Sequence, residues 1–296
     1  MGTAPLRPLI WALPLLLFSH DAWAWGLYTH VHFTQLLICT VPLLDSRFRK
    51  AAQRFPELAL AGACLPDLAL MGVPARTTAF KNNHEWETAR RLLADADSPE
   101  HRALALGYAS HLMVDIVAHH HFVPAHETRW GRVSMLTHAL SEWAMDAHIA
   151  PHLRTRPIQL LAEPRLAEFV AAHFDCSRQI AGRALGLLIT GETALRRSRF
   201  PQGFYRTVRN WDEGMCRRFD RYLVHTQRQL PQINRILEGE TPTWHAEPCN
   251  PSTTSKPGRP LPRDFFHPWP KEKISHQKES LARPKPMTAP ASTSLG

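Results

Sequence analysis

The spacing of hydrophobic residues predicts helices along most of the chain. Apolar side chains recur every three or four residues, which is the period of a helix with one buried face. The segments with this period are residues 32–55, 85–96, 99–119, 134–153, 165–174, 178–197 and 208–230. Alternating β-branched runs and Asn-Gly turns, which are typical of strands and hairpins, are missing from the sequence. We therefore expect an all-α protein built as a multi-helix bundle.

Prolines indicate where two of these helices begin or break. Pro42 interrupts the periodic segment 32–55, because proline cannot donate a backbone hydrogen bond inside a helix. Ser98 and Pro99 form a helix start, since serine is a good N-cap and proline is well tolerated at the first helical position. The long segment that contains His111 is thus expected to begin at Pro99.

The first 24 residues have the features of a secretory signal peptide. Arg7 supplies a positive charge, residues 8–18 are apolar, and residues 22–24 form an A-x-A cleavage site. The apolar run is shorter than a membrane-spanning helix, and no later segment is longer. We therefore expect a secreted or periplasmic protein without a transmembrane segment after cleavage. Its first residue would be Trp25, with a free α-amino group.

The C-terminal segment, residues 241–296, differs in composition from the helical body, residues 25–240. It contains 11 of the 25 prolines, and eight Lys or Arg against four Asp or Glu. Such a composition cannot bury a core, so this basic Pro-rich tail is predicted to be disordered. The tail supplies +4 of the formal net charge of +9. The mildly basic body therefore does not by itself indicate a nucleic acid or a membrane as partner.

Two pairs of residues stand out among the 18 histidines of the chain. His111 and Asp115 are four residues apart on a predicted helix, and His138 and Glu142 repeat that spacing. Residues four apart project from one helix face, with Cβ atoms roughly 5–6 Å apart. An imidazole and a carboxylate held in this way can share a zinc ion. Either pair alone is weak evidence for a metal, because a histidine and a carboxylate four residues apart often occur by chance or as a surface hydrogen bond.

Five further residues become ligand candidates because of their order along the chain: Trp25, His30, Asp67, His84 and His121. Taken singly, an aspartate such as Asp67 is more often a helix cap, and a histidine such as His84 is more often a loop or cap residue. The complete order is Trp25, His30, Asp67 and His84, then an HxxxDxxxxxH core of His111, Asp115 and His121, and finally the HxxxE pair of His138 and Glu142.

This order resembles the zinc-dependent phospholipase C family and the related zinc-dependent single-strand nucleases. In these proteins the N-terminal Trp of the mature chain binds zinc through its α-amine and carbonyl oxygen, and Trp25 and His30 have the spacing found in the nucleases. The sequences of residues 61–67 and 111–124 are more similar to the bacterial phospholipase C branch than to the nucleases. The resemblance extends over residues 25–142, and the tail has no counterpart in it.

The resemblance implies a cluster of two or three Zn²⁺ ions inside the helical bundle. The first ion would be held by Asp67, His84, His111 and Asp115. The second would be held by Trp25, His30 and Asp115, and the third, open to water or substrate, by His121, His138 and Glu142. The chain departs from the family where a proline usually stands two residues before the third core ligand. His119 stands at that position and competes with His121 as a ligand, and His126 is a further candidate.

The implied activity is that of a hydrolase, a secreted zinc-dependent phosphodiesterase that cleaves phospholipids as a phospholipase C does. The cluster would activate a water molecule and neutralise charge on the phosphoryl group, and Asp67 is the expected catalytic residue that orients or deprotonates this water. The expected substrate is a phospholipid or another phosphodiester. A protein that acts on phospholipids could also contact the membrane surface peripherally.

Two alternatives stay open at this point. A single-strand nuclease would bind nucleic acid and would need aromatic surfaces for base stacking, for which Trp86, Trp130 and Trp143 are candidates. The other alternative is a zinc-binding surface protein without catalytic activity.

Overall fold

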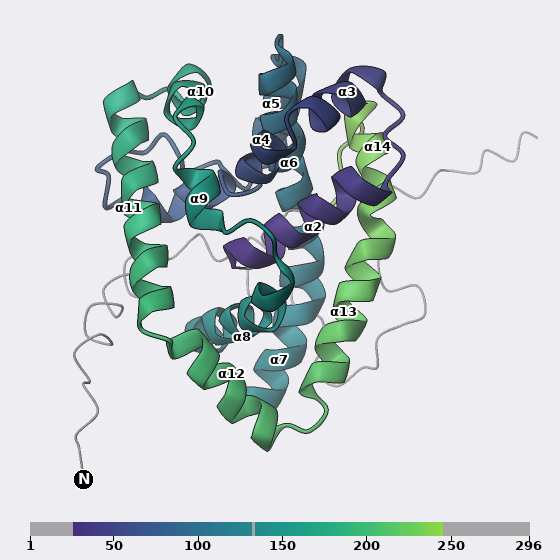
Figure 1. Ribbon diagram of the computed structural model, residues 1–296, viewed down its shortest axis with the longest axis vertical. Coiled ribbons are helices and arrows are strands. Elements are labelled where there is room, and N and C mark those ends of the chain that lie inside the picture. Colours follow the sequence, from purple (N-terminus) through teal and green to yellow (C-terminus); the bar gives the residue numbers. More distant parts are fainter. Residues whose placement is uncertain (1–25, 132–133, 245–296) are drawn as a thin grey trace, which may run out of the picture.

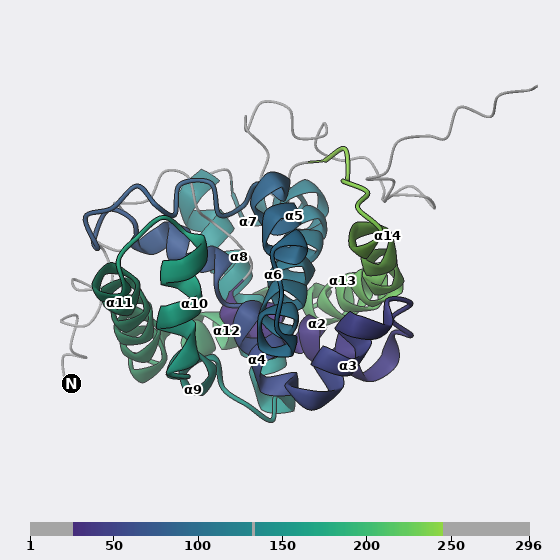
Figure 2. The same cartoon turned by 90° about the horizontal axis from the view of Figure 1, so that it is seen from above.

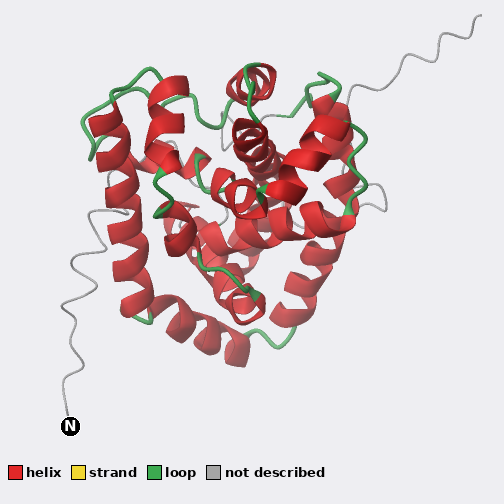
Figure 3. Cartoon of the chain, turned by 45° about the horizontal axis from the view of Figure 1, so that its top comes forward, coloured by secondary structure: helices red, strands yellow, loops and turns green. Residues whose placement is uncertain are grey.

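The computed structural model describes residues 26–131 and 134–244, and the regular structure in these residues is entirely helical (Figures 1 and 3). The predicted all-α bundle is thereby confirmed. The predicted signal peptide, Trp25 and the tail from residue 245 onward lie outside the described residues. The helices are α2 (Leu27–Thr40), α3 (Ser46–Arg54), α4 (Pro56–Gly62), η1 (Pro66–Met71), α5 (Trp86–Ala94), α6 (Pro99–Val117), η2 (Ala118–Phe122), α7 (Val123–Trp130), α8 (Ser134–Ile149), η3 (Ala150–His152), α9 (Pro157–Leu161), α10 (Arg165–His173), α11 (Arg178–Arg197), α12 (Phe200–Trp211), α13 (Met215–Gln229), η4 (Leu230–Gln232) and α14 (Ile233–Leu237).

The expected helix boundaries at the two prolines are confirmed. Helix α2 ends at Thr40, before Pro42, and α3 begins at Ser46. The backbone N–H of His101 donates a 3.1 Å hydrogen bond to the side chain of Ser98, so this serine caps α6 as predicted. The first turn of the longest central helix is therefore fixed by its own sequence.

One predicted helix is interrupted. The periodic segment 208–230 breaks between α12 and α13, at residues 212–214. Asp212 turns into the protein there, where its carboxylate accepts a 3.1 Å hydrogen bond from Trp130 Nε1 and pairs with Arg218. The contact with Trp130 on α7 and the local pair with Arg218 explain a corner that the hydrophobic period did not indicate.

Helix α6 lies at the centre of the fold, with α2, α3, α4 and α5 packed around it (Figures 1 and 2). Nearly all of its residues from Ala103 to Val117 are buried. Gly62 and Gly107 allow α4 to lie directly on α6, because a Cβ atom added at either glycine would overlap the backbone of the other helix. The chain that follows α4 is thereby brought beside His111, one helical turn after Gly107.

Helix α8 forms the second central layer, against α2, α7 and α12. The long helices α11 and α13 lie on opposite sides of this core, and α12 joins them along the lower edge of the view in Figure 1. Helices α2, α6 and α8 therefore meet in the interior, and the ligand candidates predicted on them lie there.

The last described residues pack back onto the body. Trp86 Nε1 donates a 2.8 Å hydrogen bond to the carbonyl oxygen of Trp244. The Trp244 ring lies 4.8 Å from that of His120 and 5.5 Å from that of His121, between ring centroids. Packing thus extends at least four residues beyond the boundary expected at residue 240. Among the described helices, none has the length and apolar character needed to cross a membrane.

Candidate metal centre

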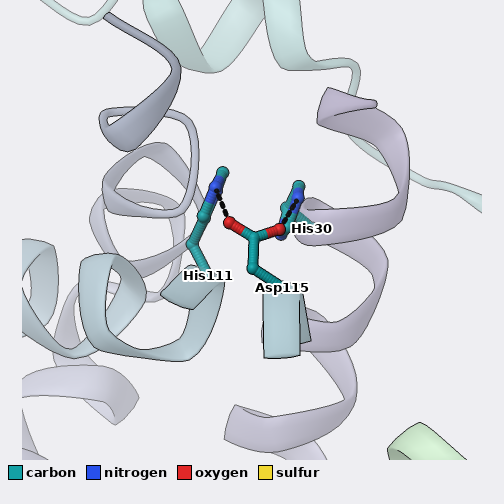
Figure 4. A group of neighbouring side chains, drawn as sticks. All are labelled: His30, His111 and Asp115. Carbon is teal, nitrogen blue, oxygen red and sulfur yellow. Dashed lines mark ion pairs between the residues drawn. The ribbon is translucent and has the colours of Figure 1, made fainter. Parts of the chain in front are cut away.

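The carboxylate of Asp115 lies at the centre of a buried histidine cluster (Figure 4). Its Oδ1 atom lies 3.2 Å from His30 Nε2 of α2. Its Oδ2 atom lies 3.0 Å from His111 Nε2, one turn earlier on α6. The imidazole rings of His30 and His111 stack at 3.5 Å between centroids. Each carboxylate oxygen therefore faces a different imidazole, which suits a carboxylate that bridges two cations.

These buried atoms form a site that fits a metal ion. His30, His111 and Asp115 are fully buried, and His119 is nearly so. The contacts among them lack hydrogen-bond geometry, so the Nε2 atoms of the three histidines and both oxygens of Asp115 have no hydrogen-bond partner. Buried polar atoms without partners are costly. Cations bound among them would satisfy these atoms.

The tautomer of His111 is fixed from outside the cluster. Its Nδ1 atom lies 2.7 Å from the carbonyl oxygen of Ala63, just after α4. A carbonyl oxygen only accepts, so Nδ1 carries the proton and donates to it. Nε2 is therefore the nitrogen left to bind a metal, and it faces Asp115, as in histidine ligands oriented by a second hydrogen bond. The close contact of α4 with α6 thus positions this ligand.

Asp67 and His84 come from loop and 3₁₀ segments that are tied together. The side chain of Asn83 donates 3.2 Å hydrogen bonds to the carbonyl oxygens of Leu65 and Pro66. The chain just before α5 is thereby fixed against the start of η1. Asp67 Oδ1 lies 3.9 Å from His111 Nε2, and His84 Nε2 lies 3.6 Å from Asp115 Oδ2. Asp67, His84 and His111 form a second group with ligand atoms within 4.8 Å of one another.

The third group consists of His119, His138 and Glu142, with ligand atoms within the same 4.8 Å limit. His138 Nε2 lies 2.8 Å from Glu142 Oε1, as the spacing on α8 predicted. His119 Nε2 also lies 3.8 Å from Asp115 Oδ1, so this group adjoins the first one. The side chain of His138 is 19% exposed, whereas that of Glu142 is 4% exposed. The centre is thus most open to solvent beside His138.

His121 is placed away from this third group. The helix continues past Asp115 through the π-turn η2, in which the N–H of Val123 donates to the carbonyl oxygen of Ala118. His119, four residues after Asp115, stays on the face of His111 and Asp115. His121 lies instead against Trp244, and its carbonyl oxygen accepts a 3.3 Å hydrogen bond from the Tyr222 hydroxyl. The described geometry therefore favours His119 of the two competing candidates.

The remaining candidates occupy structural positions. His126 is buried beside Phe122, whose carbonyl oxygen lies 2.8 Å from its Nδ1 atom. Trp86 is buried, Trp130 packs against His126, and Trp143 packs edge-on against Phe200. None of these side chains belongs to the three groups of ligand candidates in the described residues.

Burial shifts three histidines of the centre, but not His111, toward the neutral form in the metal-free protein. It lowers the pKa of His84 to about 3 and that of His119 well below its usual value. Burial, together with the charge of His111, also lowers the pKa of His30. A neutral imidazole offers the lone pair that a metal ion requires, so these three side chains are available as ligands at neutral pH. Burial also acts to lower the pKa of His111, but the charges of Asp115 and Asp67 outweigh it and raise that pKa.

The carboxylates of the centre are shifted in opposite directions. Burial raises the pKa of Asp67 to about 7 and that of Glu142 well above its usual value. Burial also acts to raise the pKa of Asp115, but the charges of His111 and His30 outweigh it and hold that pKa well below the usual range. Asp115 is thus the carboxylate that stays anionic at neutral pH without a metal.

Two residues beside the centre were not predicted from the sequence. Asp146 is fully buried and contacts the start of α2, and Arg196 of α11 pairs with it. Asp146 follows His138 and Glu142 at the same four-residue interval. That continued spacing is a signal from which Asp146 could have been found, whereas nothing in the sequence pairs it with Arg196.

The described chain is thus an all-helical protein with three adjoining groups of imidazole and carboxylate ligands, the donor types that bind zinc. A family model described as zinc dependent phospholipase C matches residues 29–187, more than half of the 296 residues. The chain therefore belongs to the zinc-dependent phospholipase C family, and the resemblance noted in its sequence is confirmed. Searches of curated proteins and of solved structures gave no match.

Proposed function

We propose that the chain is a secreted or periplasmic phosphodiesterase that hydrolyses phospholipids as a phospholipase C does. The observation that supports this best is the buried carboxylate of Asp115. Its oxygens lie within 4 Å of imidazole nitrogens from His30, His84, His111 and His119. Neither Asp115 oxygen has a hydrogen-bond partner. Such an arrangement suits a cluster of cations better than a packed core, and the family supports Zn²⁺ as that cation.

The ligand sets follow the three groups of the centre. We assign one ion to Asp67, His84, His111 and Asp115, a second to Trp25, His30 and Asp115, and a third to His138 and Glu142 with His119 in place of His121. Bound zinc would supply electrostatic activation of water and would neutralise negative charge on the phosphoryl group.

The chain's own residues have separate roles in this proposal. Asp67, whose Oδ1 atom lies 3.9 Å from His111 Nε2 within the centre, is placed to accept a proton from the attacking water at a carboxylate oxygen that does not bind the metal. The partly exposed side of the centre beside His138 admits the phosphodiester. The buried side, formed by α2 and α6, excludes water from the other ligands.

The positions of two aromatic candidates, Trp86 and Trp130, weaken the nuclease alternative. Trp86 and Trp130 donate hydrogen bonds inside the fold to Trp244 and Asp212, so their rings are engaged in packing. Base stacking would require exposed ring faces near the ligands. Trp86 and Trp130 therefore do not support the nuclease alternative.

The proposal is tested by assaying the zinc-loaded mature chain on phospholipid vesicles and on a single-stranded oligonucleotide. We expect diacylglycerol and a phosphorylated head group from the vesicles, and no cleavage of the oligonucleotide. Glu142→Gln keeps the shape of the third group but removes its charge. It should lower the rate by about 10²-fold or more, with an unchanged circular dichroism spectrum.

The other outcomes distinguish the alternatives. Cleavage of the oligonucleotide alone would establish the nuclease. Full zinc content without turnover of either substrate would indicate a zinc-binding protein that is not an enzyme.

A pair of matched substitutions separates His119 from His121. We expect His119→Ala to lower the zinc content and the rate of hydrolysis, because its Nε2 atom lies 3.8 Å from Asp115 Oδ1 within the centre. His121→Ala should keep the zinc content, because its ring packs against Trp244. Elemental analysis of both purified variants measures the difference, and loss of zinc in His121→Ala alone would reverse the assignment.

A further inference from the structure

The first turn of α2 is capped by a residue far away in the sequence. Gly26, the N-cap residue, has no side chain that could accept from this turn. The carboxylate of Asp146 takes that role. Its Oδ1 atom accepts hydrogen bonds from the backbone N–H of Thr29 at 3.0 Å and from the Thr29 hydroxyl at 2.9 Å, and its Oδ2 atom accepts from the Tyr28 N–H at 3.4 Å. A buried negative charge is thus placed at the positive end of the helix dipole.

Asp146 is itself held in place by α11. Arg196 Nη2 lies 2.5 Å from Asp146 Oδ2, while Arg196 Nε lies 2.5 Å from Glu192 Oε1. The guanidinium also lies over the ring of Tyr28, 4.2 Å from its centroid. Every acceptor position of the Asp146 carboxylate is therefore used inside the protein, so Asp146 is not available as a metal ligand.

This cap adjoins two of the proposed ligands in the chain. His30 directly follows Thr29, and Trp25 directly precedes Gly26. A Cβ atom added at Gly26 would overlap the carboxylate of Asp146, so the backbone there lies directly against it. We propose that Asp146, braced by Arg196, is a positioning residue that holds His30 against the ligands on α6 and α8. This inference rests on the proposed zinc centre.

The test compares Asp146→Ala with Asp212→Ala. Asp212 is also a buried aspartate that pairs with an arginine and accepts an N–H hydrogen bond, but its partners are Arg218 and Trp130 at the α12–α13 corner. Zinc affinity is measured by competition with a chromogenic chelator, and mass spectrometry confirms that each chain begins at Trp25. Asp146→Ala should bind zinc about 10- to 100-fold more weakly, the usual cost of losing a group that orients ligands. Asp212→Ala should keep the wild-type affinity even if it unfolds at a lower temperature.

A double-variant cycle links the effect to the contact itself. Gly26→Ala alone should also weaken zinc binding, because its methyl group displaces the Asp146 carboxylate. In the Asp146→Ala background the same change should add little, since the overlapping group is gone, so the two effects should not be additive. Asp146→Asn, which keeps the shape but removes the charge, replaces Asp146→Ala if that variant does not fold.

Failure of this inference differs from failure of the proposed function. If the wild-type chain binds zinc and Asp146→Ala binds it as tightly as Asp212→Ala does, Asp146 is only a structural cap. If the wild-type chain binds no zinc, the proposed function is wrong, and the inference is wrong with it. Hydrogen exchange in the metal-free protein tests the cap separately. The Tyr28 and Thr29 amides should exchange faster in Asp146→Ala, and unchanged exchange would show that the carboxylate does not hold α2.

Discussion

Asp115→Asn should remove at least one zinc ion from each chain and abolish most of the hydrolytic activity. Asn has nearly the same shape as Asp but no charge, so two adjacent cations would lose the anion that lies between them. Zinc affinity should fall by more than the roughly 10- to 100-fold cost of losing an outer-shell partner. The rate should fall by more than about 10²-fold, the cost of removing one charge-stabilising group from an active site.

Thermal unfolding with and without a chelator provides the second measurement for this variant. A ligand that binds only the folded state raises its stability, so chelation should lower the melting temperature of the wild-type protein. The melting temperature of Asp115→Asn should respond much less to chelation. Asp212→Asn is the control, and its response should match that of the wild type. A full zinc content in Asp115→Asn would contradict the bridging role.

The part of the site that could be predicted from the sequence depends on local helix geometry. His111 and Asp115, like His138 and Glu142, are four residues apart, and an α-helix brings such residues together whatever the tertiary fold. The structure places both pairs as expected, with 3.0 Å and 2.8 Å between their facing atoms. Outer helices such as α13 were predictable because they bury one face of regular period, here Met215, Phe219, Tyr222 and Thr226.

The choice between His119 and His121 could not be made from the spacing alone. The HxxxDxxxxxH pattern fits His121 when the helix ends soon after the aspartate, as a proline at position 119 would favour. This chain has a histidine there, and its helix continues through the π-turn η2 into α7. His119 therefore stays on the face of Asp115, whereas His121 is rotated toward Trp244.

The tertiary contacts around the site could not be predicted from any local sequence pattern. Asn83 fixes His84 beside Asp67 through carbonyl oxygens 17 and 18 residues away. Asp146 caps a helix that starts more than 100 residues earlier, with Thr29 as its partner across 117 positions. Such contacts depend on how α2, α8 and α11 pack, which the hydrophobic period of each helix does not specify.

An extra Met residue before Trp25 should cost the protein at least one zinc ion and most of its activity. The α-amine of Trp25 is proposed to bind zinc, and it must lose its proton to do so. An α-amine has a pKa of about 7.7–8.0, so zinc can displace this proton near neutral pH. The added residue would turn the amine into an amide, which is a very poor ligand.

The structure makes this prediction sharper, although Trp25 lies outside the described residues. Gly26 lies against the carboxylate of Asp146, and His30, one turn into α2, lies 3.2 Å from Asp115. The described chain therefore begins, at Gly26, beside the Asp146 carboxylate and within about one turn of the proposed ligand His30. The helices of the Met-extended protein should stay intact, because the periodic segments that form them lie after residue 25.

The matched control keeps the free terminus and changes only the side chain. Trp25→Phe retains the α-amine and the carbonyl oxygen, so it should bind as much zinc as the wild type. Elemental analysis and phospholipid hydrolysis are measured on the mature, Met-extended and Trp25→Phe forms, with circular dichroism to confirm equal helicity. If the Met-extended form keeps all of its zinc and its rate, the N-terminus is not a ligand. In that case the second ion would have to be held by His30 and Asp115 without it.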